Sequence, residues 1–230
     1  MSGRLVSVVT PAFEEEAFIA EALQSVLAQT YRPVELIVVD DGSRDRTAEI
    51  AAAHEARVLR RPQRGGPAAA RNAGLALARG DYWTIFDADD VMAPEGLSRQ
   101  VAHLEQHPEL GIVFGLTEAF VSPGEGRPSH FRSAWANGPF PWHTGTMMAR
   151  REVLELVGPF DETLRLGEDI EWLARAKDAG VRVGRADHVA LRYRIHRANT
   201  TSDTHAKQQA MLRALRMSVR RRRAGHADDC

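Results

Sequence analysis

The sequence has a single cysteine among its 230 residues, Cys230 at the C-terminal end. An internal disulfide is therefore excluded, which is typical of proteins in a reducing cytosol. No apolar run approaches the length that a transmembrane helix needs. Residues 1–9 are too few, and are followed too soon by Pro11, to form a signal peptide. We therefore expect a cytoplasmic protein without a transmembrane segment, which meets its substrates in the cytosol or at a membrane surface.

A strong net charge is also absent, because the formal charge is −1 at pH 7. Nothing in the overall composition therefore indicates a nucleic-acid partner. Positive charge is unevenly placed, and a basic run lies near the C-terminal end. The residues of this basic run are Arg213, Arg216, Arg220, Arg221, Arg222 and Arg223. We interpret the run as the solvated end of a helix, and the alternatives are a peripheral membrane contact or a homodimer interface.

Two common nucleotide-binding loops are missing from the glycine-rich segment 65–74. It has neither the lysine and hydroxyl residue of a Walker loop nor the glycine spacing of a dinucleotide-binding loop. Gly65 and Gly66 nevertheless precede a helix of small residues, which lets backbone approach a ligand closely, and Arg71 adds a cation one turn later. Because helix N-termini bind anions readily, we expect this segment to contact one.

Strand and helix patterns alternate through the first half of the chain. Strand-like apolar runs occupy residues 5–9, 36–39, 57–59 and 82–86, and helical periodicity occupies residues 18–27, 46–55 and 68–78. Glu14, Glu15 and Glu16 come before the first helical pattern, where acids favour a helix start. This alternation predicts an α/β fold with a mostly parallel central sheet and helices on both faces.

The second half of the chain is less regular. We expect helices at residues 95–107, 151–157, 169–179 and 203–222, strands at 112–119 and 189–195, and a long loop at 121–141. No linker divides the chain. We therefore predict one domain over residues 1–201, with a nucleotide-binding half at about 1–115 and an acceptor half at about 116–201. A C-terminal helix and basic tail follow at 202–230.

Carboxylates follow the predicted strands at the points where the strands end. Asp40 and Asp41 follow the second strand, and Asp87, Asp89 and Asp90 follow the fourth. Ligands of such sheets bind outside the carboxyl ends of the strands, so these acids converge on one edge. Carboxylates packed this closely repel one another unless a cation offsets the charge, and Mg²⁺ or Mn²⁺ suits such oxygen ligands. The alternative is a turn with caps for the following helix.

Two further candidates lie in the second half. Glu168 and Asp169 stand side by side at the start of a predicted helix, where an ordinary helix cap is the alternative. His196 follows an alternating strand. A lone histidine is usually structural, but a neutral imidazole also completes cation sites.

These motifs, in this order, resemble family 2 glycosyltransferases of the GT-A fold. The resemblance rests on Val6 to Phe13, Val38 to Thr47, Gly66 to Gly74, Gly80 to Tyr82, Asp87 to Asp90, Val157 to Glu162, Gly167 to Asp169 and Tyr193 to His196. It covers nearly the whole chain up to about residue 201. Glu14 is a departure, because the family often has asparagine there, and it bears on the preference for a base.

The resemblance implies an inverting transfer of one sugar from a nucleoside-diphosphate donor, with uridine diphosphate favoured and Mn²⁺ or Mg²⁺ as cofactor. It implies that Asp169 is the general base, with Glu168 beside it, and that Asp89 and His196 contact the metal. The residues implied to bind the nucleotide are Pro11, Ala12, Phe13, Glu16, Asp40, Arg71, Asp87 and Ala88. No Gln-x-x-Arg-Trp motif of processive synthases is present, which favours transfer of a single sugar.

The acceptor is not identified by the sequence, and a small molecule, a lipid-linked glycan and a peptide all remain candidates. Trp142 and His143 are expected to line its pocket, because aromatic faces stack on sugars. The alternative is that both side chains cap the core. Two other functions compete: a sugar nucleotidyltransferase, and a catalytically silent protein that binds nucleotide sugars. The intact acids Asp40, Asp87, Asp89 and Asp169 argue against the silent protein.

Overall fold

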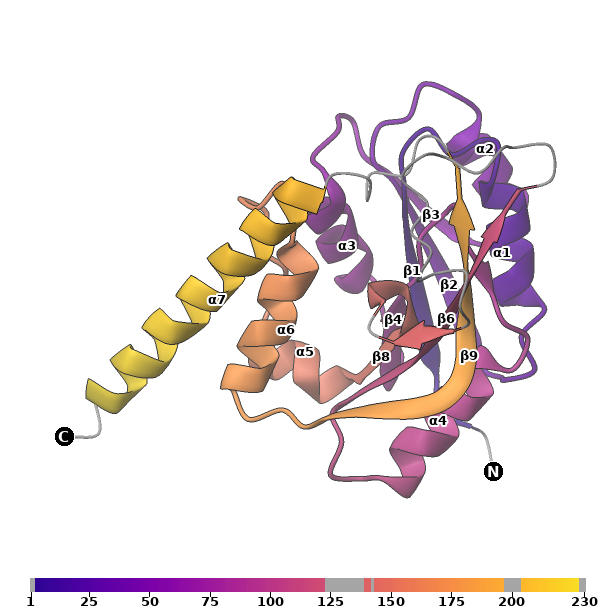
Figure 1. Cartoon of the computed structure of the whole chain (residues 1–230). Helices are drawn as coiled ribbons and strands as arrows, with labels where there is room; N and C mark the ends of the chain where they lie inside the picture. The colour runs from indigo at the N-terminus through magenta and orange to yellow at the C-terminus, as the bar shows by residue number, and fades with distance from the viewer. Residues whose placement is uncertain (1–2, 123–138, 142, 197–203, 228–230) are drawn as a thin grey trace.

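A single mixed sheet forms the centre of the protein (Figure 1). The structure is a computed structural model that describes residues 3–122, 139–141, 143–196 and 204–227. The strands are β1 (Val6–Ala12), β2 (Val34–Asp40), β3 (Arg57–Arg60), β4 (Tyr82–Ile85), β5 (Val91–Met92), β6 (Ile112–Val121), β7 (Phe140–Pro141), β8 (Met147–Arg150) and β9 (Val183–Ile195). In the described residues their order is β3-β2-β1-β4-β8-β6-β9-β5, and β7 pairs with β6.

Seven α-helices surround this sheet in the described part of the chain. They are α1 (Ile19–Leu27), α2 (Thr47–Ala52), α3 (Pro67–Leu75), α4 (Gly96–Gln106), α5 (Arg151–Val157), α6 (Glu168–Asp178) and α7 (Thr204–Ala227). A short 3-10 helix, η2, covers Thr144–Thr146. The predicted helices are all present, and their ends differ from the predicted ends by a few residues.

The first four strands form the parallel part of the sheet. β1 lies between β2 and β4, and β3 pairs with the far edge of β2. The expectation that β1 stops at Thr10 is wrong, because β1 continues through Pro11 to Ala12. Proline lacks the N–H that a ladder needs. The β1–β4 ladder ends at Val9 and Ile85, so Pro11 lies beyond it and costs no hydrogen bond on that side.

The second part of the sheet mixes both directions. β8 runs antiparallel between β4 and β6, and the long strands β6 and β9 run parallel to each other (Figure 1). β9 begins at Val183, six residues earlier than expected, and β8 was not predicted at all. Most of the residue pairs in the ladders are parallel, and helices cover both faces. The predicted fold class is confirmed.

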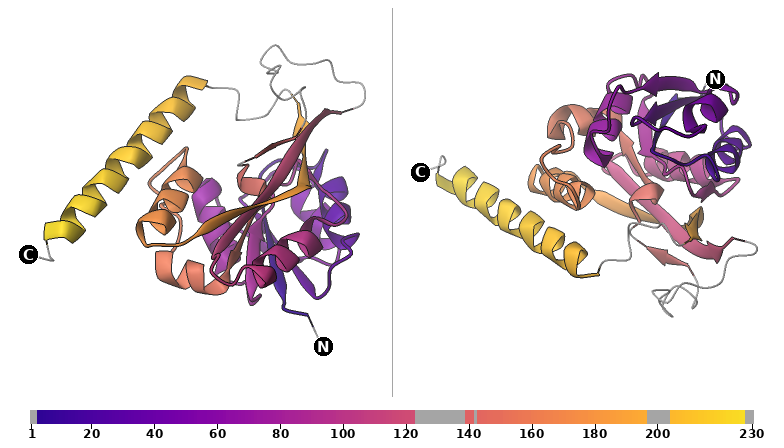
Figure 2. Two further views of the ribbon diagram at one scale, coloured as in Figure 1. Left: turned by 60° about the horizontal axis from the view of Figure 1, so that its bottom comes forward. Right: turned by 90° about the horizontal axis from the view of Figure 1, so that it is seen from above.

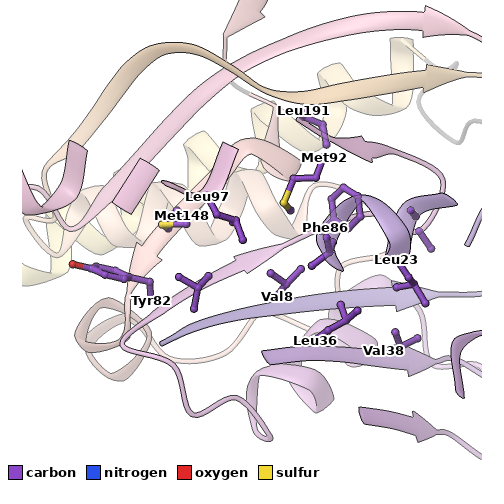
Figure 3. Packing of buried hydrophobic residues seen from close by; sticks show 14 of the residues in the cluster. Val8, Leu23, Leu36, Val38, Tyr82, Phe86, Met92, Leu97, Met148 and Leu191 are labelled. Carbon is purple, nitrogen blue, oxygen red and sulfur yellow. The ribbon is translucent and has the colours of Figure 1, made fainter. Parts of the chain in front are cut away.

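Strand residues alternate between two cores, one on each face of the sheet. The first core packs Val8 and Val38 against α1, α2 and α4, and Figure 3 shows ten labelled members of it, including Phe86 and Leu97. The second packs Val9 and its neighbours against α3, α5 and α6. There the Trp83 and Trp172 rings meet edge to face, with their centroids 5.2 Å apart.

α7 is the outermost element and packs on α6 (Figure 2). A Cβ atom at Gly167 would lie 2.5 Å from Cβ of Ala210, so the glycine allows α7 to approach the start of α6 closely. In the described residues, no helix has the length and apolar character required to cross a membrane. Most of the long loop expected at residues 121–141 lies outside the described residues. The division into a nucleotide half and an acceptor half stays a prediction.

Candidate active site at the carboxyl edge of the sheet

Asp40 ends β2 at the carboxyl edge of the sheet, opposite Ala12 of β1. Its side chain is fully buried. Oδ1 accepts a hydrogen bond of 3.0 Å from the backbone N–H of Ser43. Oδ2 lies 3.2 Å from Nε of Arg60, yet it is buried without a hydrogen bond among the described residues. A buried carboxylate oxygen with spare capacity is suited to accept a hydrogen bond from a ligand.

The loop after β1 is attached to the loop after β2 by side-chain oxygens. The backbone N–H groups of Glu14 and Glu15 donate to Ser43 Oγ and Thr47 Oγ1, at 2.9 and 2.8 Å. The three glutamates precede α1, which starts at Ile19, as the sequence analysis expected. They belong to a loop that the β2–α2 connection holds in place.

Two predicted nucleotide contacts lie on this loop. The guanidinium carbon of Arg64 lies 3.8 Å from the centroid of the Phe13 ring. Glu16 is exposed, and its Oε2 accepts a hydrogen bond of 3.1 Å from the N–H of Arg46 just before α2. Pro11 is partly buried and Ala12 is buried beside them. Arg64 therefore covers one face of the Phe13 ring, and the described contact of Glu16 is to the protein itself.

Asp41 organises the glycine-rich segment. Its carboxylate accepts hydrogen bonds from the N–H groups of Gly65 and Gly66, the latter at 2.7 Å, and pairs with Arg61. Gly66 has a φ of 91°, a conformation that favours glycine, immediately before α3. The amides that we expected to meet an anion are therefore already bonded to Asp41, which differs from the sequence-based interpretation.

The acids after β4 divide into two roles. Asp90 is fully buried, and its Oδ1 accepts a hydrogen bond of 2.8 Å from the N–H of Arg194, which attaches β9 to the end of β4. Asp89 Oδ2 lies 3.0 Å from Nε2 of His196, and the His196 ring packs on Phe18. The sheet thus joins a carboxylate and an imidazole that are 107 residues apart.

Arg194 supports the same acids, and the sequence analysis did not identify it. Its Nε donates to the backbone oxygen of Asp89 at 2.7 Å, and its Nη2 donates to Glu21 at 2.6 Å. The guanidinium carbon lies about equally far from the ring centroids of Phe18 and Phe120, at 5.1 and 4.7 Å. The buried Arg194 therefore fixes the backbone of Asp89.

Arg71 carries positive charge into the site from α3. The guanidinium is buried, pairs with Glu168 at the start of α6, and places Nη2 3.8 Å from Oδ1 of Asp87. Burial raises the pKa of Glu168, and Asp169 raises it further, while Arg71 opposes this shift. Glu168 is thus a buried partner that orients Arg71.

Asp169 lies in the first turn of α6 and contacts η2. Its Oδ2 accepts a hydrogen bond from Thr144 Oγ1 in η2, and its Oδ1 accepts one of 2.8 Å from the N–H of Ile170. His143 begins η2 by accepting a hydrogen bond from Gly145, and its ring packs on Tyr193 with centroids 4.9 Å apart. The fold therefore brings His143 and Asp169 together through η2. Trp142 lies outside the described residues.

The carboxylates of Glu15, Asp87 and Asp89 lie near one another at this edge and repel one another. Burial raises the pKa of Glu15 to about 8, and the charges of Asp89, Asp87 and Asp45 add to the effect. Burial also raises the pKa of Asp87, where Arg71 opposes the shift and Asp89 adds to it. An added cation would relieve this repulsion.

Comparison with known proteins assigns these residues to a family. The model of Glycosyl transferase family 2 matches residues 7–160. This range includes the acids at the ends of β2 and β4, which are Asp40, Asp41, Asp87, Asp89 and Asp90. The chain belongs to glycosyl transferase family 2. This confirms the resemblance that the sequence motifs indicated.

Curated relatives of this family 2 chain are also named glycosyltransferases. It is 36% identical over 116 residues to glycosyltransferase GlyG of Streptococcus pneumoniae, and the matched segment covers 48% of this chain and 38% of that protein. It is 32% identical over 190 residues to glycosyltransferase AglE of Haloferax volcanii, and the matched segment covers 76% of this chain and 62% of that protein. The chain therefore spans about two fifths to three fifths of the length of these relatives.

Solved structures share its fold. Glucosyl-3-phosphoglycerate synthase of Mycobacterium tuberculosis, in complex with Mn²⁺, UDP and phosphoglyceric acid, is 26% identical with a TM-score of 0.67, covering 94% of this chain and 78% of that one. The mannosyltransferase PcManGT of Pyrobaculum calidifontis, in complex with GDP-Man and Mn²⁺, is 22% identical with a TM-score of 0.73, covering 96% and 65%. The GT-A fold prediction for this family 2 chain is confirmed.

The candidate metal ligands of the family 2 chain form a pair rather than a closed shell. Within the described ranges, no three His, Cys, Asp or Glu side chains gather closely enough to hold a cation. Asp89 and His196 are the two predicted ligands that do meet. Ala88 between the acids is buried in the core, so its side chain serves packing. The nucleotide-binding, metal-binding, catalytic and acceptor roles that the sequence analysis gave to the site residues stay predictions.

Glu15 gives the family 2 chain a testable dependence on pH. Above pH 4.5 the unfolded chain releases this proton, whereas the folded chain keeps it until about pH 8, so folded stability falls as pH rises between these values. Glu15→Gln removes this loss. Because Glu15 is only partly buried, water screens part of this effect. We therefore expect Glu15→Gln to stabilise the metal-free protein by about 1–2 kcal/mol at pH 8, roughly 2–6 °C in Tm, and by little at pH 5. Thermal melts with chelator at both pH values measure this, and equal gains at both would contradict it.

Proposed function

We propose that the chain is an inverting glycosyltransferase, which moves one sugar from a UDP-sugar to an acceptor nucleophile with the help of Mn²⁺ or Mg²⁺. The observation that carries this proposal is the meeting of three groups at one edge of the sheet. These are the buried Asp40, the Asp89–His196 pair, and Asp169 at the start of α6. A relative with the same fold is described with UDP and Mn²⁺, which supports the donor and the metal.

The nucleoside would lie across the ends of β1 and β2. Asp40 Oδ2 is buried with acceptor capacity to spare at the end of β2, and Phe13, which follows β1 directly, carries an aromatic ring that Arg64 covers on one face. These two features suit a flat base that carries a donor N–H group. Uracil has such an N–H, and so does thymine, which makes dTDP the nearest competitor of UDP.

The diphosphate would lie over the acids after β4. Asp89 and His196 would hold the metal, because Mg²⁺ and Mn²⁺ suit a carboxylate oxygen and Mn²⁺ also accepts an imidazole nitrogen. A bound metal ion supplies positive charge that stabilises the departing diphosphate. Burial is the main cause of the raised pKa values of Glu15 and Asp87, and Asp89 adds to both; a bound cation would offset this contribution of Asp89, which fits the assignment.

Asp169 would act as the general base. It takes a proton from the acceptor while the acceptor atom bonds to the anomeric carbon, and the bond from that carbon to the diphosphate oxygen breaks with its electron pair leaving on the diphosphate. Thr144 holds one oxygen of Asp169 and so orients it. A single displacement from the opposite face inverts the anomeric centre. His143, and Trp142 outside the described residues, remain our proposed acceptor contacts.

A donor screen tests this proposal. Thermal melts of the purified chain are measured with UDP, dTDP and GDP, each with and without Mn²⁺. We expect UDP to raise Tm only when Mn²⁺ is present, because a ligand that binds only the folded state stabilises it by mass action. A shift with GDP or dTDP alone would overturn the choice of base. The absence of any shift would overturn the site itself.

A further inference from the structure

The C-terminal helix α7 has one face fixed to the domain. Ala214 and Ser218 are buried against α6, and Ser218 Oγ donates to Asp178 at 2.8 Å. Arg221 pairs with both Asp178 and Glu171 of α6. These contacts set the rotation of α7 about its axis, so the side chains on its remaining faces have defined directions.

A second face of α7 is apolar and exposed. Met211, Leu212, Leu215 and Val219 each leave about half of their side-chain surface in solvent, from 48 to 55%. Leu215 and Val219 follow Met211 at intervals of four residues, so these side chains form one continuous row on the helix. Of the seven large hydrophobic residues exposed in the described chain, four are in this row. Large apolar side chains gathered in this way mark an interaction surface.

A third face of α7 is basic and adjoins the apolar row. Arg213, Arg216 and Arg220 are exposed and follow one another at intervals of three and four residues. Arg216 is four residues from Leu212 and three from Val219, so it lies beside the apolar row. No Asp or Glu occurs between residues 204 and 227, which leaves this positive charge unbalanced within the helix.

We propose that this surface of α7 binds an anionic phospholipid bilayer. A helix that lies in a membrane interface combines an apolar row, which enters the acyl boundary, with basic side chains that reach the lipid headgroups. Each basic residue near an anionic surface adds attraction. α7 has both features side by side on the part of its surface that α6 leaves free.

The charges favour a bilayer over the other partners that such a surface suggests. Two copies of α7 packed through their apolar rows would bring two rows of arginines together without acids to balance them, which is unfavourable. A nucleic acid would satisfy the arginines but would leave Leu212, Leu215 and their neighbours in water. Only an anionic surface with an apolar interior matches both faces at once.

Vesicle flotation of the whole chain tests this proposal. The probes are vesicles of phosphatidylcholine alone and of phosphatidylcholine with about a third phosphatidylglycerol. We expect binding to the anionic vesicles that weakens with added salt. Leu215→Glu should lower the apparent affinity by at least about tenfold, because it places a charge in the apolar row. Leu156→Glu is the matched control, since Leu156 is exposed on α5 outside the surface, and it should bind as the wild type does.

Three outcomes would overturn the proposal. The first is no binding to anionic vesicles, and the second is equal binding by the Leu215→Glu and Leu156→Glu variants. The third is a dimer in light scattering that Leu215→Glu dissociates while vesicles do not bind, which would assign the surface to a second copy. Hydrogen exchange of the wild type gives a test that needs no variant, because anionic vesicles should protect the backbone amides of α7 and of no other helix.

Discussion

Replacing Asp169 with asparagine is expected to lower the rate of sugar transfer by about 10²–10⁴-fold while donor binding stays unchanged. Asparagine keeps the size of the side chain and can still accept the hydrogen bond from Thr144, but it cannot take a proton from the acceptor. The metal pair Asp89–His196 and the buried Asp40 are untouched by this change. Product formation measures the first effect, and the Mn²⁺-dependent UDP shift in Tm measures the second.

Thr144→Val is the matched comparison for this variant. It removes the hydroxyl that orients Asp169 but leaves the carboxylate in place, so we expect a smaller loss of the transfer rate, on the order of tenfold. Full activity of Asp169→Asn would overturn its role as the base. A wild type that binds UDP and Mn²⁺ but turns over no donor would favour a silent nucleotide-sugar-binding protein.

The parallel part of the fold was accessible from the sequence because its signals are local. Apolar runs of three to five residues, followed by turn residues such as Asp40 to Ser43, mark both the strands and their carboxyl ends. β8 gives no such signal. Its four residues, Met147–Arg150, lie between η2 and α5, and they become a strand because β4 and β6 pair with its two sides. A pairing between distant segments has no local pattern.

The site shows the same division between local and distant information. Asp40, Asp89 and Asp169 were assigned from motifs that resemble a family, yet their partners come from the topology of the sheet. His196 reaches Asp89 because β9 runs beside β6 and ends at this edge. Thr144 meets Asp169 only because η2 and the start of α6 are packed together.

Glu15 was missed for a different reason. It stands in a run of three glutamates that suits the start of a helix, and this local interpretation concealed its position beside Asp87 and Asp89. The side chains that fix its loop, Ser43 and Thr47, belong to the next connection along the sheet. A sequence pattern that has two physical explanations is resolved only by the contacts.

Replacing Asp89 with alanine is expected to abolish the effect of Mn²⁺ on UDP binding and to lower kcat/KM by more than about 100-fold. Residues that only support metal ligands already cost about 10–100-fold in metal affinity or activity when they are changed, so the loss of a ligand should cost more. The change also leaves His196 without the carboxylate that lies 3.0 Å from its Nε2. Titration of the wild type and the variant with Mn²⁺ in the presence of UDP measures the first effect.

Asp90→Asn separates a metal role from a general effect of acidic charge. Asp90 is the next residue along the chain, but its Oδ1 serves the N–H of Arg194, and the asparagine oxygen can accept the same hydrogen bond. Burial and the neighbouring Asp89 and Asp87 raise the pKa of Asp90 well above its usual range, so the neutral amide resembles the protonated acid that the fold favours. Mn²⁺-dependent UDP binding should therefore survive this substitution within a factor of about three. Equal losses in Asp89→Ala and Asp90→Asn would mean that this loop responds to any substitution, and the assignment of Asp89 as a ligand would then be wrong.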